Sequence, residues 1–172
     1  FVILLLLYLN FRSFAKAFII MGTLPLSAVG GVWLLWLLGY NLSVAVDVGF
    51  IALAGVAAEA GVVMLVYLDG ALKHRQELAV AEKRAFTEED LREAVVDGAV
   101  LRVRPILMTV TAIIAGLLPI MFGDGTGAEV MRRIAAPMVG GMVSATVLAL
   151  LVVPAVYYLW QRHILSAENA GA

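Results

Sequence analysis

The sequence contains no cysteine and little charge. Without a thiol, disulfides, thiolate metal sites and cysteine nucleophiles are excluded. Charged residues make up 15% of the 172 residues and hydrophobic residues make up 63%, whereas an ordinary soluble domain carries about 25% charged residues. The formal net charge of -1 gives no indication of a nucleic-acid partner. This composition predicts a membrane protein that has the lipid bilayer as its surroundings.

Five apolar segments follow one another along the chain. A spanning helix needs about 20 apolar residues, and lipid leaves backbone groups no partner outside a helix or a closed barrel. Because period-2 alternation is absent, we expect an all-α polytopic membrane bundle. The first segment has no initiator Met and no basic stretch before it, so we interpret it as the end of a helix in a longer protein. The segments are residues 1–9, 17–38, 44–68, 105–122 and 134–160.

The connections are short, except for residues 69–104, which are polar and charged. Within this connection Thr87 predicts a helix start, because acidic residues follow it and Asp90 occupies the capping-box position. Apolar and charged residues then alternate at helical spacing, which is typical of an interfacial helix. We therefore expect a loop with an interfacial helix here, a turn at 123–133 and a tail at 161–172.

Basic residues are distributed unequally between the two sides of the predicted bundle. One side has Arg132 and Arg133, and the other side has all the rest. By the positive-inside rule, the more basic side faces the cytoplasm. This predicts an N-terminal end outside and a cytoplasmic C-terminus. The more basic side carries Arg12, Lys16, seven basic residues from Lys73 to Arg104, and Arg162.

Glycine and proline punctuate the apolar segments. The pairs Gly30-Gly31 and Gly140-Gly141 are small enough to allow close helix contact, so we expect them to serve packing. Pro105 stands at the start of the fourth segment, where a first helical turn tolerates it.

Glu59 interrupts the apolar run GFIALAGVAAEAGVVMLVYLD. It precedes Tyr67 by eight residues and so lies roughly 12 Å from the inner end of its segment, too deep for its short side chain to reach water. An apolar environment favours the neutral carboxyl group, and ionisable residues within spans are commonly functional. Glu59 is therefore a candidate proton carrier. The alternative is a protonated glutamate that only hydrogen-bonds a neighbouring helix.

Three further residues could assist proton movement. Asp47 lies twelve residues before Glu59 and about 120° around the helix, so the two do not pair directly, and Asp47 is a candidate entry-side acid. The Thr109 hydroxyl could bond the carbonyl four residues earlier or a file of water. Arg102 has a stem long enough to reach inward or to snorkel outward.

Methionine is the only soft metal ligand in the sequence that recurs. Thioethers suit Cu(I) and Ag(I), but methionine is also a common filler of apolar helices, so Met131 and the other six stay candidates for either role. His74 and His163 stand apart from other ligand types, and we expect no resident cofactor.

The sequence resembles the resistance-nodulation-division (RND) efflux pumps in the order and spacing of its motifs. These motifs are the run around Glu59 quoted above, GAVLRVRPILMT and AGLLPIMFGDGTGAEVMRRIAAPMVGGM. Within that family the sequence is most similar to the heavy-metal branch, the CusA-like copper and silver pumps. The resemblance covers nearly the whole chain. It implies the last five of twelve transmembrane helices of a homotrimeric, proton-driven pump in the bacterial inner membrane, working with a periplasmic adaptor and an outer-membrane channel. It also implies that Glu59 belongs to the proton relay and that Met131 lies on a methionine path for Cu(I)/Ag(I).

One position departs from the metal-pump pattern. After the Arg-Pro pair those pumps carry a relay lysine, and this chain has Ile106. The run RPILMT is similar to that of the hydrophobic-drug pumps, in which residues matching Arg102 and Thr109 handle protons, although those pumps have lysine at the position of Glu59. We expect Arg102, or a residue outside this chain, to supply the compensating charge.

Two other functions remain open from the sequence. The first is an RND pump for organic compounds or divalent metals, and the second is a membrane scaffold subunit that does not transport.

Overall fold

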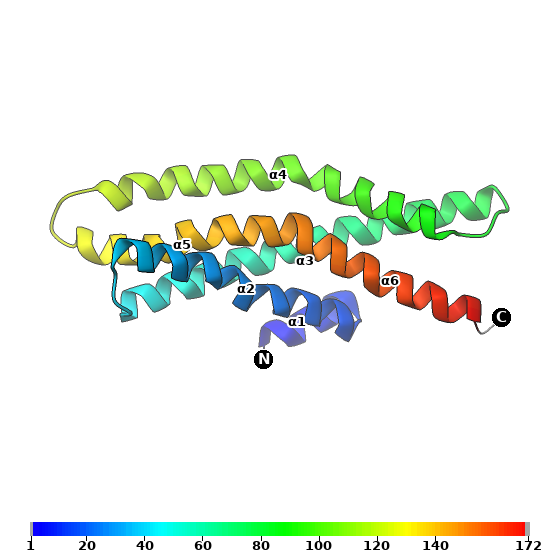
Figure 1. Cartoon of the computed structure of the whole chain (residues 1–172), viewed down its shortest axis with the longest axis horizontal. Coiled ribbons are helices and arrows are strands. Elements are labelled where there is room, and N and C mark those ends of the chain that lie inside the picture. Colours follow the sequence, from blue (N-terminus) through cyan, green and yellow to red (C-terminus); the bar gives the residue numbers. More distant parts are fainter. Residues whose placement is uncertain (1, 171–172) are drawn as a thin grey trace.

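The computed structural model describes residues 2–170 and contains helices joined by turns (Figure 1). No strand occurs within this range, which confirms the all-α expectation for the described part of the chain. The last three elements follow one another without a break and form one continuous helix. The elements are α1 (Val2–Phe11), α2 (Phe14–Leu38), α3 (Val44–Ala81), α4 (Glu88–Phe122), α5 (Ala128–Val147), the π-helical η1 (Leu148–Val152) and α6 (Val153–Ala170).

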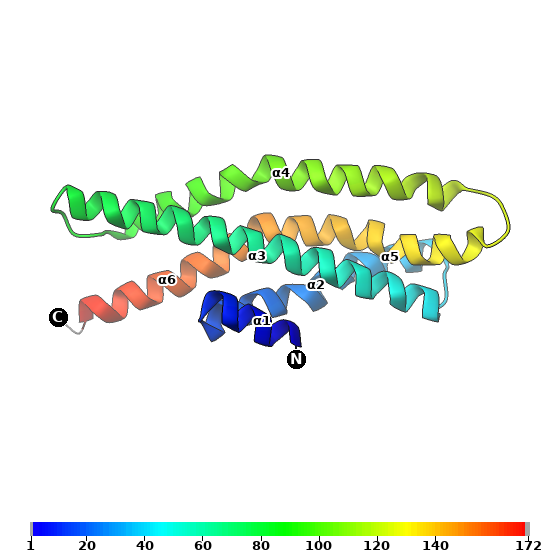
Figure 2. The ribbon, with the colours of Figure 1, turned by 180° about the vertical axis from the view of Figure 1, so that it is seen from behind.

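Four helices are long and apolar enough to cross a membrane: α2, α3, α4 and the continuous helix Ala128–Ser166. They lie side by side along the long axis of the molecule in both views (Figures 1 and 2). The first predicted segment corresponds to α1, whose 10 residues fall short of the length that a span requires.

The turns alternate between the two ends of the bundle. Residues 39–43 and 123–127 lie at one end, and residues 82–87 lie at the other, near the C-terminal end of α6 (Figures 1 and 2). This arrangement is the one expected when successive helices cross the membrane in opposite directions. We refer to the end with residues 82–87 as the basic end, because seven lysines and arginines lie between Lys73 and Arg104.

The structure differs from the expected loop at residues 69–104. There α3 continues to Ala81, α4 begins at Glu88, and residues 82–87 alone connect them. The charges that suggested a loop instead hold the two helices together, since Arg75 contacts Glu93 at 2.6 Å and Asp97 at 2.8 Å. Helical ends likewise extend into the residues predicted as the 123–133 turn and the 161–172 tail.

The start of α4 follows the predicted capping box. The Thr87 hydroxyl accepts a hydrogen bond from the backbone of Asp90 at 3.3 Å, and the Asp90 carboxylate accepts one from the backbone of Thr87 at 2.9 Å. Pro105, however, lies inside α4 and not in a first turn. Proline removes one backbone hydrogen bond and crowds the preceding turn, and α4 bends near its middle (Figure 1).

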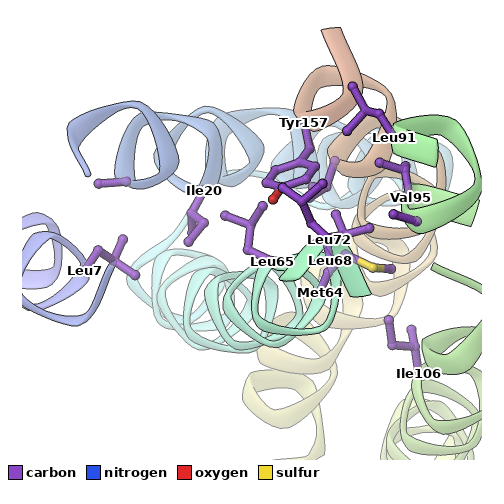
Figure 3. Close-up of a cluster of buried hydrophobic side chains, with 13 residues drawn as sticks. Leu7, Ile20, Met64, Leu65, Leu68, Leu72, Leu91, Val95, Ile106 and Tyr157 are labelled. Atoms are coloured by element: carbon purple, nitrogen blue, oxygen red, sulfur yellow. The ribbon is translucent and has the colours of Figure 1, made fainter. Parts of the chain in front are cut away.

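The main hydrophobic core gathers around α3. Met64, Leu65 and Leu68 are fully buried there, against side chains of α1, α2, α4 and α6 (Figure 3). Ile106 of α4 belongs to the same cluster and is 5% exposed. The core therefore joins α3 to four other helices of the bundle.

Glycine pairs allow α2 and α5 to touch through their backbones. A Cβ atom on Gly30 would overlap the carbonyl oxygen of Gly140, and one on Gly140 would overlap that of Gly30. Beside this contact Ser144 Oγ donates a hydrogen bond to the carbonyl oxygen of Ser27 at 2.6 Å. The expectation that these glycines serve close packing is confirmed.

We expect Gly30→Ala to lower the free energy of unfolding by about 1–3 kcal/mol, because the new methyl group must push two backbones apart. Gly22→Ala is the matched control on the same helix, since nothing lies within 4 Å of its Cβ position. That control should keep or slightly raise stability. Unfolding in detergent would measure both changes, and equal stability of the two variants would contradict the packing role.

Candidate functional site

One cavity between α3 and α4 brings together the residues that the sequence singled out for proton movement. Glu59 lines it from α3, and Arg102 and Thr109 line it from α4, about 43 to 50 positions further along the chain. The cavity has a volume of about 60 Å³. Arg102, Ile106 and Thr109 follow one another at spacings of four and three residues, which places them on one face of α4. We call this space the Glu59 cavity.

Glu59 shares the cavity with a cation but does not pair with it. Within residues 2–170, the Glu59 carboxylate takes part in no ion pair. Arg102 therefore lies where it could compensate the charge of Glu59 after a rearrangement of side chains. The expected compensation stays a prediction.

The Arg102 guanidinium packs instead on an aromatic ring. Its central carbon lies 4.8 Å from the centroid of the Tyr67 ring, which is the geometry of a cation–π contact. The Arg102 Nε atom is buried and has no hydrogen-bond partner among the described residues. A buried donor without a partner is costly, so the Nε atom opposes this position of Arg102 while the contact with the ring favours it.

The Thr109 hydroxyl donates to the Pro105 carbonyl oxygen at 3.1 Å. This is the backbone bond to the residue four positions earlier, the first of the two uses considered from the sequence. A hydroxyl that donates one hydrogen bond can still accept another. Thr109 can therefore still receive a hydrogen bond from water in the cavity.

Ile106 fills the position at which the family resemblance implies a lysine. It lines the Glu59 cavity and is buried in the main core. Arg102 is one helical turn earlier on the same face of α4, so the cation that lines the cavity is displaced by about 6 Å along the helix from this position.

Two predicted site residues lie away from the cavity. Asp47 is exposed in the first turn of α3, and Met131 is 54% exposed near the start of α5. Neither lines the Glu59 cavity. Both follow turns at the end of the bundle opposite the basic end. Within the described residues, no group of three histidine, aspartate or glutamate side chains could hold a metal ion.

The sequence analysis missed a second polar cluster on α3. Asp69 contacts Lys16 Nζ at 2.5 Å and accepts a hydrogen bond from the Tyr157 hydroxyl at 2.5 Å. Gln161 in turn donates to the Tyr157 hydroxyl at 3.3 Å. The cluster joins α2, α3 and α6. The position of Asp69 at the end of an apolar run was a visible signal, but its partners are 53 and 88 residues away.

We expect Ile106→Lys to be tolerated when Glu59 is present, because the carboxylate can pair with the new ammonium group. Combined with Glu59→Gln, the lysine becomes an unpaired buried charge, which is strongly destabilising. A double-mutant cycle on unfolding in detergent should give a coupling of about 1–3 kcal/mol between the two positions. Additive effects would show that the two side chains do not meet.

Comparisons with known proteins show which family this chain belongs to. Residues 1–161 match the model of the AcrB/AcrD/AcrF family. The chain is 55% identical over 162 residues to the cation efflux system protein CusA of Escherichia coli, covering 94% of this chain and 15% of that protein. It is 56% identical over 162 residues to the putative cation efflux system protein SilA of Salmonella typhimurium, with the same coverage.

A more distant relative and a solved structure extend the comparison. The cobalt-zinc-cadmium resistance protein CzcA of Cupriavidus metallidurans is 36% identical over 169 residues, covering 97% of this chain and 14% of CzcA. A crystal structure of a heavy metal efflux pump matches with a TM-score of 0.77 and 37% identity, covering 94% of this chain and 14% of that one. The chain thus spans about a seventh of the length of these relatives. By its sequence and its fold, it belongs to the AcrB/AcrD/AcrF family of resistance-nodulation-division efflux pumps.

Proposed function

We propose that this chain is the C-terminal membrane region of a proton-driven pump that exports heavy-metal cations, most specifically Cu(I) or Ag(I). In this proposal Glu59, Arg102 and Thr109 form its proton relay. The observation that carries the proposal is their meeting at one cavity between two apolar helices. Glu59 supplies the titratable group, Arg102 a permanent positive charge and Thr109 a hydroxyl that can accept from water.

The relay works by changing what surrounds the Glu59 carboxyl group. Away from a cation, the Glu59 carboxylate takes up a proton from the outer side and becomes neutral, which is the form that apolar surroundings favour. When the Arg102 guanidinium approaches, it favours the carboxylate and the proton is released toward the cytoplasm. Thr109 lines the same cavity and can hold a water molecule near Glu59. The energy of inward proton movement drives metal outward, with no covalent chemistry.

The proposed substrate follows from the pattern of identities. The chain is more similar to CusA and SilA, at 55% and 56%, than to CzcA at 36%. CzcA is named for resistance to cobalt, zinc and cadmium. This difference, together with the resemblance to copper and silver pumps, supports a monovalent soft cation. The metal ion and the protons are transported across the membrane, and the proposal includes no resident cofactor.

The basic end of the bundle is proposed to face the cytoplasm. The opposite end then faces the periplasm, where Met131 and Asp47 lie near the two outer turns. We propose Met131 as a contact on the outer part of the metal path and Asp47 as an entry-side acid. The α1 to α6 region corresponds to the last five of twelve helices of an inner-membrane homotrimer that joins a periplasmic adaptor and an outer-membrane channel.

Glu59→Gln in the full-length pump should slow proton-coupled export by about 100-fold at normal protein level, because an amide has the same shape but cannot take up and release a proton near neutral pH. Glu77→Gln is the matched control, an exposed glutamate on the polar part of the same helix, and should export normally. Metal-dependent proton uptake into inside-out vesicles would measure both. Unchanged export by Glu59→Gln would exclude Glu59 from the proton relay.

Arg102→Met should likewise uncouple transport, since methionine keeps the apolar stem and loses the charge. Arg104→Met is its control, because Arg104 is exposed and lies off the face of α4 that lines the cavity. Export by Arg102→Met at the rate of the parent pump would exclude Arg102 from the relay.

A resistance test would decide the substrate. The full-length pump, expressed in a host that lacks its own pump, would be challenged with copper, silver, zinc and an organic dye. Resistance to copper and silver is the expected result. Resistance to the dye alone would contradict the metal proposal.

A further inference from the structure

The continuous helix Ala128–Ser166 contains the irregular turn η1. Here the Val153 N–H donates to the carbonyl oxygen of Leu148, five residues earlier. Pro154 follows at once, and a proline has no N–H and crowds the carbonyl four residues before it. The helix changes direction between α5 and α6 (Figures 1 and 2). Because helices bend most readily at prolines and π-helical turns, η1 is a weak point of this helix.

A second weak point lies opposite η1, in α2. Pro25 stands inside that helix, and Thr23 and Ser27 on either side of it line a narrow gap together with Ala149 of η1. Their hydroxyls donate to carbonyl oxygens three residues earlier, at 2.6 Å and 2.7 Å. Such bonds to a helix's own carbonyls bend the helix, as proline does. Both helices are therefore weakened at the same level of the bundle.

The gap extends to α3, where Ala57 and Gly61 line it. Both residues are buried, and the gap leaves no room for a water molecule. Glu59 is two residues from each of them, which places it about 200° around the helix. The gap and the Glu59 cavity therefore lie on opposite sides of α3. We call this space the α3 gap.

Contacts fasten the helices on both sides of this level. Away from the basic end, the backbone contact of Gly30 with Gly140 joins α2 to α5. Toward the basic end, the Asp69 carboxylate contacts Lys16 of α2 and Tyr157 of α6, each at 2.5 Å. Asp69 belongs to α3, which has no proline along its whole length. The basic-end parts of α2 and α6 are thus tied to an unbroken α3, whereas their continuations are tied to each other.

We infer that α3 shifts into the α3 gap, and that Pro25 and η1 are two hinges that let the basic-end parts of α2 and α6 follow it. Shifts of about 1–2 Å are typical of packed helices. Because Glu59 is on the side of α3 away from the gap, each shift carries its carboxyl group away from Arg102 of α4, and the return brings the two groups closer. The hinges rest on packing, and their use in proton movement rests on the proposed function.

Gly61→Ala tests whether the α3 gap is used, because it fills the space without overlap. The new Cβ atom would lie 3.5 Å from Ile20 and 3.8 Å from the Thr23 hydroxyl, which is ordinary contact. In the full-length pump we expect metal export to fall by about threefold to tenfold, since a conformational step is slowed. The thermal unfolding midpoint should stay the same or rise, because alanine favours a helix over glycine.

Gly22→Ala is the matched control for this change, since nothing lies within 4 Å of its Cβ position. It should export normally at an equal or higher unfolding midpoint. Export by Gly61→Ala at the rate of the parent pump would overturn the use of the α3 gap.

Distances between spin labels test the hinges without relying on transport. The chain contains no cysteine, so labels can be attached to two introduced cysteines in the full-length pump, with any other cysteines replaced and unlabelled copies in excess. The pair Val32→Cys and Leu159→Cys spans both hinges, because these exposed residues lie on the outer part of α2 and on α6. The pair Phe18→Cys and Leu159→Cys is the control, because Phe18 is exposed on the basic-end part of α2.

Pulsed electron paramagnetic resonance should give a broad distribution for the Val32–Leu159 distance. Gly61→Ala should narrow it. Glu59→Gln should shift it by about 2 Å, because an amide, like the protonated carboxyl group, does not attract Arg102. The Phe18–Leu159 distribution should be the same in all three backgrounds, and an equal change there would overturn the hinges.

The outcomes separate this inference from the proposed relay. If Gly61→Ala does not narrow the Val32–Leu159 distribution, the hinges fail whatever the role of Glu59. If it does but Glu59→Gln causes no shift, the hinges stand and their link to the relay fails.

Discussion

Lipid offers no hydrogen-bond partner, and this constraint governs where every polar group of the chain lies. It requires the apolar segments to be helices, because a helix satisfies its own backbone. It also makes helix association depend on close contact and not on apolar burial alone. The backbone contact between Gly30 and Gly140 and the hydrogen bond from Ser144 to Ser27 meet both requirements. These contacts hold α2 against α5.

Two acidic residues of α3, Asp69 and Glu59, meet this constraint in opposite ways. Both carboxylate oxygens of Asp69 have partners, since Lys16 contacts one and Tyr157 contacts the other. This cluster joins α2, α3 and α6. Glu59 shares its cavity with Arg102 but is not paired with it. A structural role suits Asp69, and the proposed role of proton carrier suits Glu59.

The family resemblance implies a lysine at the position of Ile106, and the absence of this lysine alters how the proposed proton relay can operate. A lysine can lose its proton when buried, whereas arginine stays charged in proteins. With Arg102 as the nearby cation, the charge beside Glu59 cannot be switched by titration of the cation itself. It can be changed only by moving the guanidinium relative to Glu59, and in this structure the guanidinium lies on the Tyr67 ring.

The local features of this protein were determined by the sequence alone. The apolar runs predicted the spans, the capping box at Thr87 predicted the start of α4, and the depth of Glu59 in its run identified it as a candidate proton carrier. Each depends on residues that are near one another in the chain. The sequence also singled out Arg102 and Thr109, the family resemblance implied that they handle protons, and both residues line the same cavity as Glu59.

Other features were decided only by the tertiary structure. Charge made the part of residues 69–104 that precedes Thr87 look like a loop, but α3 continues to Ala81 and its Arg75 pairs with Asp97 of α4. The partners of Asp69 and the stack of Arg102 on Tyr67 join helices that are distant in sequence. A pattern of neighbours gives the period and depth of a helix, but its rotation against another helix is set by contacts between side chains far apart in the chain. That rotation decides which polar groups pair and which stay free to move.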